Sequence, residues 1–211
     1  MGGLALVALM TMALPASRGA AADPVRILAL GDSLTAGYGL PRDHAFPAKL
    51  QAALVAAGIP AIVYNAGVSG DTSAGGLSRL DWAMAMAGKD RMDAVIVELG
   101  ANDGLRGLEP SATRANLDAL IGRLVEMGPA ILLTGMRAPP NLGPEYGAEF
   151  AALYPDLADK HKIFFYPFFL DGVAAIASLN QDDTIHPNSR GVDIVIGRIL
   201  PYIKEMLEMP R

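Results

Sequence analysis

The chain contains no cysteine among its 211 residues. This absence excludes disulfide bonds, a thiol nucleophile and metal sites built from thiolates. Basic residues are also in the minority, since 17 lysines and arginines stand against 22 aspartates and glutamates, for a formal net charge of −5. An acidic chain of this kind is not built to hold a polyanion. We therefore expect a small-molecule substrate and no nucleic-acid partner.

Several widespread catalytic motifs are missing as well. No G-x-S-x-G sequence occurs, which excludes the nucleophile elbow of the α/β-hydrolases. There is no H-E-x-x-H sequence and no second histidine near His186 in the chain, which argues against a metal centre. Neither a G-x-x-x-x-G-K-[ST] loop nor a dinucleotide fingerprint is present. The sequence therefore predicts no metal site and no nucleotide cofactor.

The first 22 residues differ in character from the rest. An apolar run at residues 4–14 is followed by Ala20, Ala21 and Ala22, which have the small-x-small form of a cleavage site. A membrane anchor would need about 20 apolar residues, and glycine, methionine and alanine suit a strand poorly. We interpret residues 1–22 as a secretory signal peptide, although no lysine or arginine precedes the apolar run. The prediction is a protein exported to the periplasm or the medium, without a stable membrane anchor after processing.

The remaining residues, 23–211, are expected to form a single domain, because about 100 to 200 residues is the usual domain size and no linker or repeat interrupts them. Continuous apolar runs indicate strands that are covered on both faces. They lie at residues 25–30, 61–64, 94–99, 130–133 and 163–165. Helical spacing separates several of them, and in the last such segment, 191–207, Pro201 should kink or split the helix. This alternation predicts an α/β fold, a three-layer α/β/α sandwich around a parallel sheet of about five strands.

Ligands of open parallel sheets bind beyond the carboxyl ends of the strands. Polar clusters follow the first three apolar runs, and a fourth lies near the end of the chain; they contain Ser33, Gly70, Asn102 and the pair Asp183 and His186. A serine hydroxyl attacks a carbonyl when a base removes its proton, and that base needs a third group to hold its tautomer. His186 and Asp183 fit these roles, since Pro187 keeps His186 out of helical geometry and a loop can turn the carboxylate back onto the imidazole. Taken alone, the pair is more typical of an incidental surface turn.

The negatively charged oxygen of a tetrahedral intermediate needs hydrogen-bond donors that already point at it. The candidate donors are the backbone N–H groups of Ser33 and Gly70 and the side-chain amide of Asn102. Glycine suits such a position because a Cβ would obstruct a close approach of the backbone, and an asparagine amide donates without carrying charge. Each cluster alone would be an ordinary turn, but the four together indicate a hydrolase site.

At these residues the chain resembles the SGNH (GDSL) hydrolase family, in the branch that contains bacterial thioesterases, lysophospholipases and arylesterases. The family's serine, glycine, asparagine and histidine match Ser33, Gly70, Asn102 and His186, in the stretches ILALGDSLTAGYG, VSGDTS, ELGANDGLRG and DTIHPN. The resemblance implies a flavodoxin-like fold, no cofactor, and acyl-enzyme chemistry. Ser33 would be the nucleophile, His186 the base and Asp183 its partner, while Ser33, Gly70 and Asn102 would form the oxyanion hole. Asp32 and Asp103 are expected to shape turns.

The substrate is less well defined by the sequence. The leucines after Asn102 and the segment around Met136 are predicted to line an apolar groove for acyl esters or thioesters of medium length, or else to plug the edge of the sheet. The five candidate substrate-binding residues are Leu105, Leu108, Met136, Pro140 and Leu142. Our leading hypothesis is an exported monomeric esterase/thioesterase acting on acyl and aryl esters. The alternatives are a lysophospholipase, a carbohydrate deacetylase, and a non-catalytic lipid-binding module.

Overall fold

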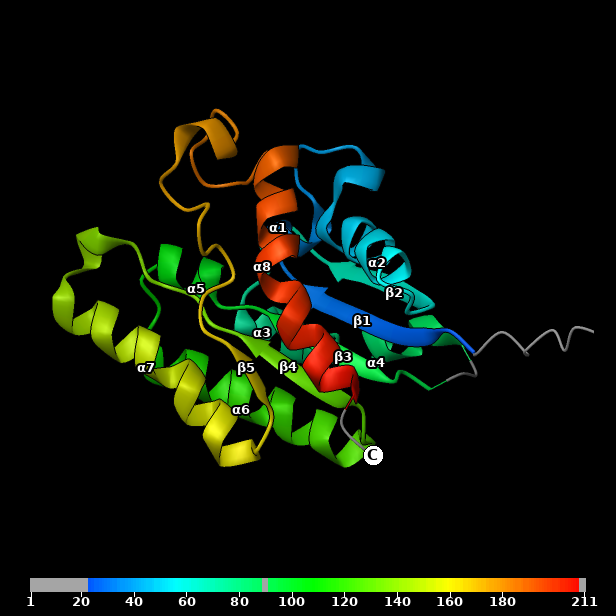
Figure 1. Cartoon of the computed structure of the whole chain (residues 1–211). Coiled ribbons are helices and arrows are strands. Elements are labelled where there is room, and N and C mark those ends of the chain that lie inside the picture. Colours follow the sequence, from blue (N-terminus) through cyan, green and yellow to red (C-terminus); the bar gives the residue numbers. More distant parts are fainter. Residues whose placement is uncertain (1–22, 89–90, 209–211) are drawn as a thin grey trace, which may run out of the picture.

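Five parallel strands form the centre of the molecule (Figure 1). The structure, a computed structural model, describes residues 23–88 and 91–208. The strand order is β2-β1-β3-β4-β5, which is the flavodoxin-like order expected from the resemblance. The strands span Val25–Gly31 (β1), Ala61–Gly67 (β2), Ala94–Glu98 (β3), Ala130–Thr134 (β4) and Phe164–Tyr166 (β5). Each predicted apolar run became one strand, so the predicted α/β fold is confirmed.

Helices cover both faces of this sheet (Figure 1). Helices α2 (Phe46–Ala56) and α8 (Ser189–Glu208) pack together on one face. The other face is covered by α3 (Ser73–Ser78), α4 (Leu80–Met84), α6 (Pro110–Met127) and α7 (Pro144–His161). Two short helices, α1 (Ser33–Ala36) and α5 (Ala101–Leu105), directly follow strands. Short 3₁₀ turns lie at Arg42–His44, Ala85–Ala87, Pro140–Leu142 and Ala177–Leu179.

Helix α8 continues through Pro201 as one element, so the expected split does not occur. Proline inside a helix costs about 3 kcal/mol, because it removes one hydrogen bond and its ring clashes with the carbonyl four residues earlier. The carbonyl concerned is that of Gly197. The buried stripe of the helix includes Val195, Ile199 and Ile203, and burying each such side chain stabilises the fold by about 1.5 to 3 kcal/mol. The free energy gained by burying these side chains therefore exceeds the cost of Pro201 in the helix.

Helix α7 was not recognised in the sequence. It begins at Pro144, which suits the first helical position, and it contains Pro155. Its inward side chains include Phe150, Tyr154 and Leu157, which are buried against the sheet. The helical pattern of these apolar positions is hard to detect in the sequence, because Pro155 and several charged residues lie among them.

The predicted signal peptide, residues 1–22, lies outside the described residues and stays a prediction. Over residues 23–88 and 91–208, no helix combines the length and the apolar character that crossing a membrane requires.

Candidate active site

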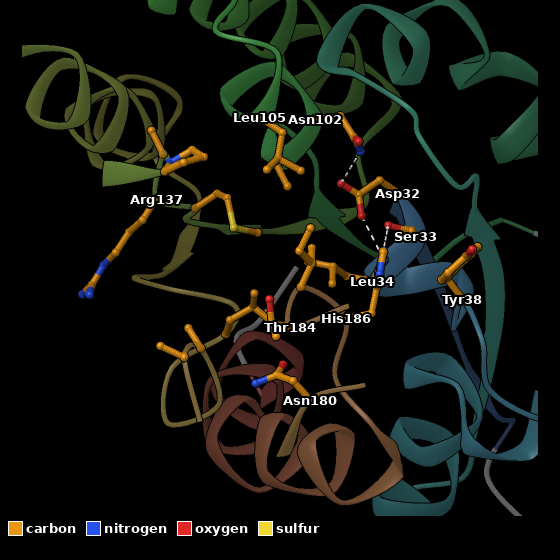
Figure 2. Close-up of a pocket in the computed structure, with 18 of the residues that line it drawn as sticks. Asp32, Ser33, Leu34, Tyr38, Asn102, Leu105, Arg137, Asn180, Thr184 and His186 are labelled. Atoms are coloured by element: carbon orange, nitrogen blue, oxygen red, sulfur yellow. Dashed lines mark hydrogen bonds between the residues drawn. The ribbon is translucent and has the colours of Figure 1, made fainter. Parts of the chain in front are cut away.

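The predicted site residues come from four separate segments that follow strands of the sheet, and Figure 2 shows Ser33, Asn102 and His186 close together. Ser33 begins α1 directly after β1, and Asn102 lies in α5 after β3. Gly70 follows β2, and His186 lies in the long connection between β5 and α8. Strands β1 and β3 are neighbours at the point where the chain direction across the sheet reverses, which is where sheets of this order bind ligands.

Ser33, His186 and Asp183 form a continuous hydrogen-bonded chain. The Oγ of Ser33 lies 2.8 Å from Nε2 of His186, and Nδ1 of the same ring lies 2.7 Å from Oδ2 of Asp183. The Ser33 side chain is nearly buried, and the imidazole is mostly covered. The arrangement matches a nucleophile, a base and a group that orients the base.

The Asp183 carboxylate is held by the turn that it belongs to. Its Oδ1 accepts the backbone N–H groups of Ile185 and His186, both at 3.0 Å. Thr184 adopts a positive φ of 63°, which brings the chain back on itself so that both oxygens face His186. The hydrogen bond from the His186 backbone, followed by that from its ring, lowers the pKa of Asp183 to about 2. The carboxylate is therefore ionised at neutral pH, as an orienting partner of the imidazole must be.

The candidate oxyanion donors differ in how free they are. Within the part of the chain that the structure describes, the backbone N–H groups of Ser33 and Gly70 donate no hydrogen bond. Gly70 has a φ of +80°, and a Cβ there would meet only the Arg106 guanidinium, at 3.8 Å. Glycine is needed here for its backbone conformation. The expected obstruction by a Cβ is not the reason, because the space beside Gly70 is open.

The amide of Asn102 is not free. Its Nδ2 donates to Oδ2 of Asp32 at 3.0 Å and to the carbonyl of Asp71 at 2.8 Å. An amide NH₂ group has two hydrogens, so both are engaged by the protein. To bind an oxyanion, Asn102 must release or share one of these hydrogen bonds.

Asp32 and Asp103 shape the turns around the site, as the sequence analysis expected. Oδ1 of Asp32 caps α1 by accepting the N–H of Leu34 at 2.9 Å. Asp103 is buried and accepts the backbone N–H of Ser73 at 2.8 Å, which joins α5 to α3. Burial raises the pKa of Asp32 to about 6, while the Leu34 N–H and the nearby His186 act in the opposite direction.

An apolar cavity of about 670 Å³ opens beside Ser33 and His186 (Figure 2). Of the five predicted substrate-binding residues, Leu105, Met136 and Pro140 line it. Leu108 and Leu142 do not: Leu108 is exposed on the loop before α6, and Leu142 lies beside Gly107. Further apolar lining comes from Leu34, Ala138, Pro139, Phe168 and Leu170.

Three residues at the site escaped sequence reasoning. The ring of Tyr38 lies 4.7 Å from the His186 ring, measured between centroids. Arg106 donates to the carbonyl of Gly70 at 2.7 Å. Arg79 pairs with Asp71 at 2.6 Å and donates to the carbonyls of Ala66 and Gly31 at 2.8 and 2.9 Å. Tyr38 and Arg106 lie within the quoted motifs and were therefore within reach, but no local pattern marks Arg79.

Most of the chain matches a known protein family. The GDSL-like lipase/acylhydrolase family matches residues 29–194, which include every predicted catalytic and oxyanion residue. The chain belongs to this family of serine hydrolases.

Its relatives are enzymes that act on ester bonds. The esterase TesA of Pseudomonas aeruginosa is 38% identical over 181 residues, which cover 86% of this chain and 89% of that protein. Thioesterase 1/protease 1/lysophospholipase L1 of Escherichia coli K12 is 40% identical over 171 residues, 81% of this chain and 78% of that protein. The crystal structure of AlinE4, an SGNH-hydrolase family esterase, has a TM-score of 0.74 at 45% identity, covering 89% of this chain and 98% of that one.

Arg79 should be essential for stability, because it joins the carboxyl ends of β1 and β2 to Asp71. Its side chain is mostly buried, and removing one partner of a buried ion pair costs about 3 to 5 kcal/mol. We expect Arg79→Met to lower the free energy of unfolding by about this amount in urea denaturation at pH 7. Arg79→Lys should not restore it, because an ammonium cannot reproduce the planar fork of donors.

The exposed pair of Arg114 and Asp156 provides the matched control for this measurement. Arg114→Met should cost less than about 1 kcal/mol, since surface ion pairs contribute little. Equal losses in Arg79→Met and Arg114→Met would show that Arg79 does not tie the strand ends together.

Proposed function

We propose that Ser33 is the nucleophile of an esterase/thioesterase that hydrolyses acyl and aryl esters through an acyl-enzyme. The observation that carries this proposal is the chain from Ser33 through His186 to Asp183, with bonds of 2.8 and 2.7 Å, at the mouth of an apolar cavity. Nucleophilic catalysis requires a hydroxyl, an oriented imidazole and a substrate cavity in this relative position.

The proposed reaction can be described by the transfers of the Ser33 hydroxyl proton. His186 takes the Ser33 proton on Nε2 as Oγ attacks the acyl carbon, and ionised Asp183 stabilises the imidazolium. The tetrahedral intermediate collapses when His186 protonates the departing alcohol or thiol, which leaves the acyl group on Ser33. Water then enters, His186 removes one of its protons, and the same steps in reverse order release the carboxylic acid and regenerate the Ser33 hydroxyl.

The oxyanion of both intermediates would be bound by the N–H groups of Ser33 and Gly70 and by the Asn102 amide. The two backbone donors are unengaged in the free enzyme, whereas Asn102 is bonded to Asp32 and Asp71. A negatively charged oxygen is a stronger acceptor than a carbonyl, so it can draw one Asn102 hydrogen away from Asp71 as charge develops. Asn102 would then bind the transition state more strongly than the substrate, which is the requirement for catalysis.

The apolar cavity favours an acyl chain over a sugar as the substrate. Besides Asp32 and the candidate catalytic and oxyanion residues, its lining contains aliphatic side chains, two prolines and one phenylalanine, together with five polar side chains, those of Tyr38, Ser69, Arg137, Asn180 and Thr184. The same cavity would accept the fatty-acyl chain of a lysophospholipid, so lysophospholipase activity is a second candidate. A carbohydrate deacetylase would require more polar groups in this wall. A non-catalytic lipid-binding module has no need of the complete Ser33, His186 and Asp183 chain.

Replacing either end of the Ser33–His186 hydrogen bond should abolish the activity. Residues joined in such a hydrogen-bonded catalytic arrangement act as a unit. Ser33→Ala and His186→Ala should therefore each lower kcat for p-nitrophenyl butyrate by at least about 10³-fold. An organophosphonate should add one equivalent to the wild type, and mass spectrometry should locate it on Ser33.

A second histidine supplies the control. His161 also contacts a carboxylate, with its Nε2 2.6 Å from Oδ1 of Asp118, yet it lies on α7 away from the cavity. His161→Ala should keep kcat within about twofold, because it leaves the site intact. Full activity in Ser33→Ala would rule out the assignment of the nucleophile.

Leu105 should set the length of the acyl chain that fits. It lines the cavity and is about half exposed, so a larger side chain can be accommodated there without disturbing the core. Each buried methylene is worth about 0.8 kcal/mol, so kcat/KM of the wild type should rise from acetate to octanoate esters. Leu105→Trp should lower kcat/KM for the octanoate by at least about 10-fold and leave the acetate within about threefold.

Leu108 is the matched control, because it follows Leu105 by three residues and has similar exposure but lies outside the cavity. Leu108→Trp should leave kcat/KM unchanged at every chain length. If both tryptophans had the same effect, or if Leu105→Trp damaged acetate hydrolysis as much as octanoate hydrolysis, the acyl chain would not bind along Leu105.

We also propose that residues 1–22 direct export and that the processed domain acts as a monomer. The support for export is the apolar run at residues 4–14 and the alanines that follow it. Amino-terminal sequencing of the protein released from the periplasm should begin at Asp23. Retention of the intact leader in the cytoplasm would contradict the export.

A further inference from the structure

Glu98, the last residue of β3, lies directly beneath the turn that carries Ser33. Its side chain is completely buried. Oε2 accepts the hydroxyl of Thr35 at 2.8 Å and the backbone N–H of Asp32 at 3.3 Å. The other oxygen, Oε1, is buried and has no hydrogen-bond partner among the described residues. The reaction proposed above assigns no part to this carboxyl group.

The close packing around Gly31 fixes where the carboxyl group lies. A Cβ at Gly31 would come within 2.6 Å of Oε2 of Glu98 and 2.1 Å of the Thr35 hydroxyl. Strand β1 therefore ends on a residue without a side chain, and the Glu98 carboxyl occupies the space. From this position Oε2 reaches both the Thr35 hydroxyl and the Asp32 backbone N–H.

Asp32 extends these contacts to the rest of the site. Its backbone N–H is bonded to Glu98, while its own carboxylate accepts the N–H of Leu34 and the amide of Asn102. Residues 32, 34 and 35 surround Ser33 in the sequence. A single network of hydrogen bonds thus runs from Glu98 through the nucleophile turn to a candidate oxyanion donor.

The two buried carboxyl groups differ in their surroundings. Each oxygen of Asp32 accepts a hydrogen bond, and His186 attracts its negative charge. Glu98 has donors on one oxygen only, and burial, followed by repulsion from Asp32, raises its pKa well above the usual range.

The other ionisable groups near this pair do not supply a free positive charge. Tyr154 of α7 is buried and donates to the carbonyl of Leu99, and burial raises its pKa as well. Asp103 of α5 is bonded to Ser73, and Arg79, which contacts the Gly31 carbonyl, is paired with Asp71. Since an unpaired buried anion is costly, the proton belongs on Glu98.

We propose that Glu98 is a positioning residue that fixes the Ser33 hydroxyl for attack, and that it does so as an uncharged acid accepting two hydrogen bonds through Oε2. The proposal rests on the proposed role of Ser33 as nucleophile. Loss of these bonds would loosen the turn, and a displacement of about 1 Å at a reacting atom can cost about 10²-fold in rate. Most of the cavity wall lies outside this turn, so KM should change little.

The test compares Glu98→Ala with Glu98→Gln, using p-nitrophenyl butyrate. We expect Glu98→Ala to lower kcat by about 10- to 100-fold with KM within about threefold of the wild type. Glu98→Gln should keep kcat within about threefold, because its amide oxygen can accept the same two bonds and the group is neutral. Its pH profile of kcat/KM should overlay that of the wild type between about pH 5 and 9.

Two further measurements keep the outcome clear if Glu98→Ala does not fold, as judged by circular dichroism. Thr35→Val removes one of the two donors without changing the volume, and it should lower kcat by about 3- to 10-fold at unchanged KM. In protein labelled with ¹³C-glutamate, the side-chain carboxyl signal that disappears in Glu98→Gln should have the shift of a neutral acid at pH 7.

The failures are distinguishable. If the wild type neither hydrolyses the ester nor reacts with the phosphonate at Ser33, the proposed function fails. If the wild type is active, wild-type kcat in Glu98→Ala or in Thr35→Val would overturn the positioning role. Equal damage in Glu98→Gln and Glu98→Ala, or an ionised ¹³C signal, would overturn the uncharged form.

Discussion

The hydrogen bond between Ser33 and His186 joins two residues 153 positions apart, and the functional site depends on it. Ser33 begins α1 directly after β1, whereas His186 lies in the connection between β5 and α8, so the contact depends on how these two segments are placed. The parallel sheet brings them together, since all five strands deliver their carboxyl ends to the same edge. Ser33 is fixed at one end by β1 and α1, and His186 at the other by the Asp183 turn and by α8.

The two ends of this bond are held by different means. On the His186 side the contacts are local: Asp183 accepts two backbone N–H groups of its own turn and the imidazole, and it lies partly in solvent. On the Ser33 side the support is long-range and buried, since Glu98 of β3 and Asp32 connect the nucleophile turn to Asn102. A rigid nucleophile and a base on a more exposed loop suit a reaction in which the imidazole must pass a proton from Ser33 to the leaving group.

The sequence revealed those features that depend on local patterns. Continuous apolar runs located the five strands, and the polar clusters that follow them located Ser33, Gly70, Asn102 and His186. What it could not reveal depends on contacts between distant segments. Nothing near Arg79 indicates that its guanidinium reaches the ends of two strands. Leu105 and Leu108 look alike in the sequence, and only the turn after α5 separates the one that lines the cavity from the one that faces solvent.

Asp32 and Asp183 affect the stability of the fold in opposite directions as the pH changes. Asp183 has a pKa lowered from 3.8 to about 2, so the folded protein releases this proton more readily, and its contribution to stability is lost as the pH falls through that range. Asp32 has a pKa raised to about 6, so the folded state holds a proton that the unfolded chain has already lost, and stability falls as the pH rises from 3.8 to 6. The ionised Asp32 that supports Asn102 and faces His186 at neutral pH is therefore kept at a cost in free energy. Strand β3, which is buried throughout, and the buried carboxyl half of its neighbour β1 supply apolar packing that offsets this cost beneath the site, at the centre of the sheet.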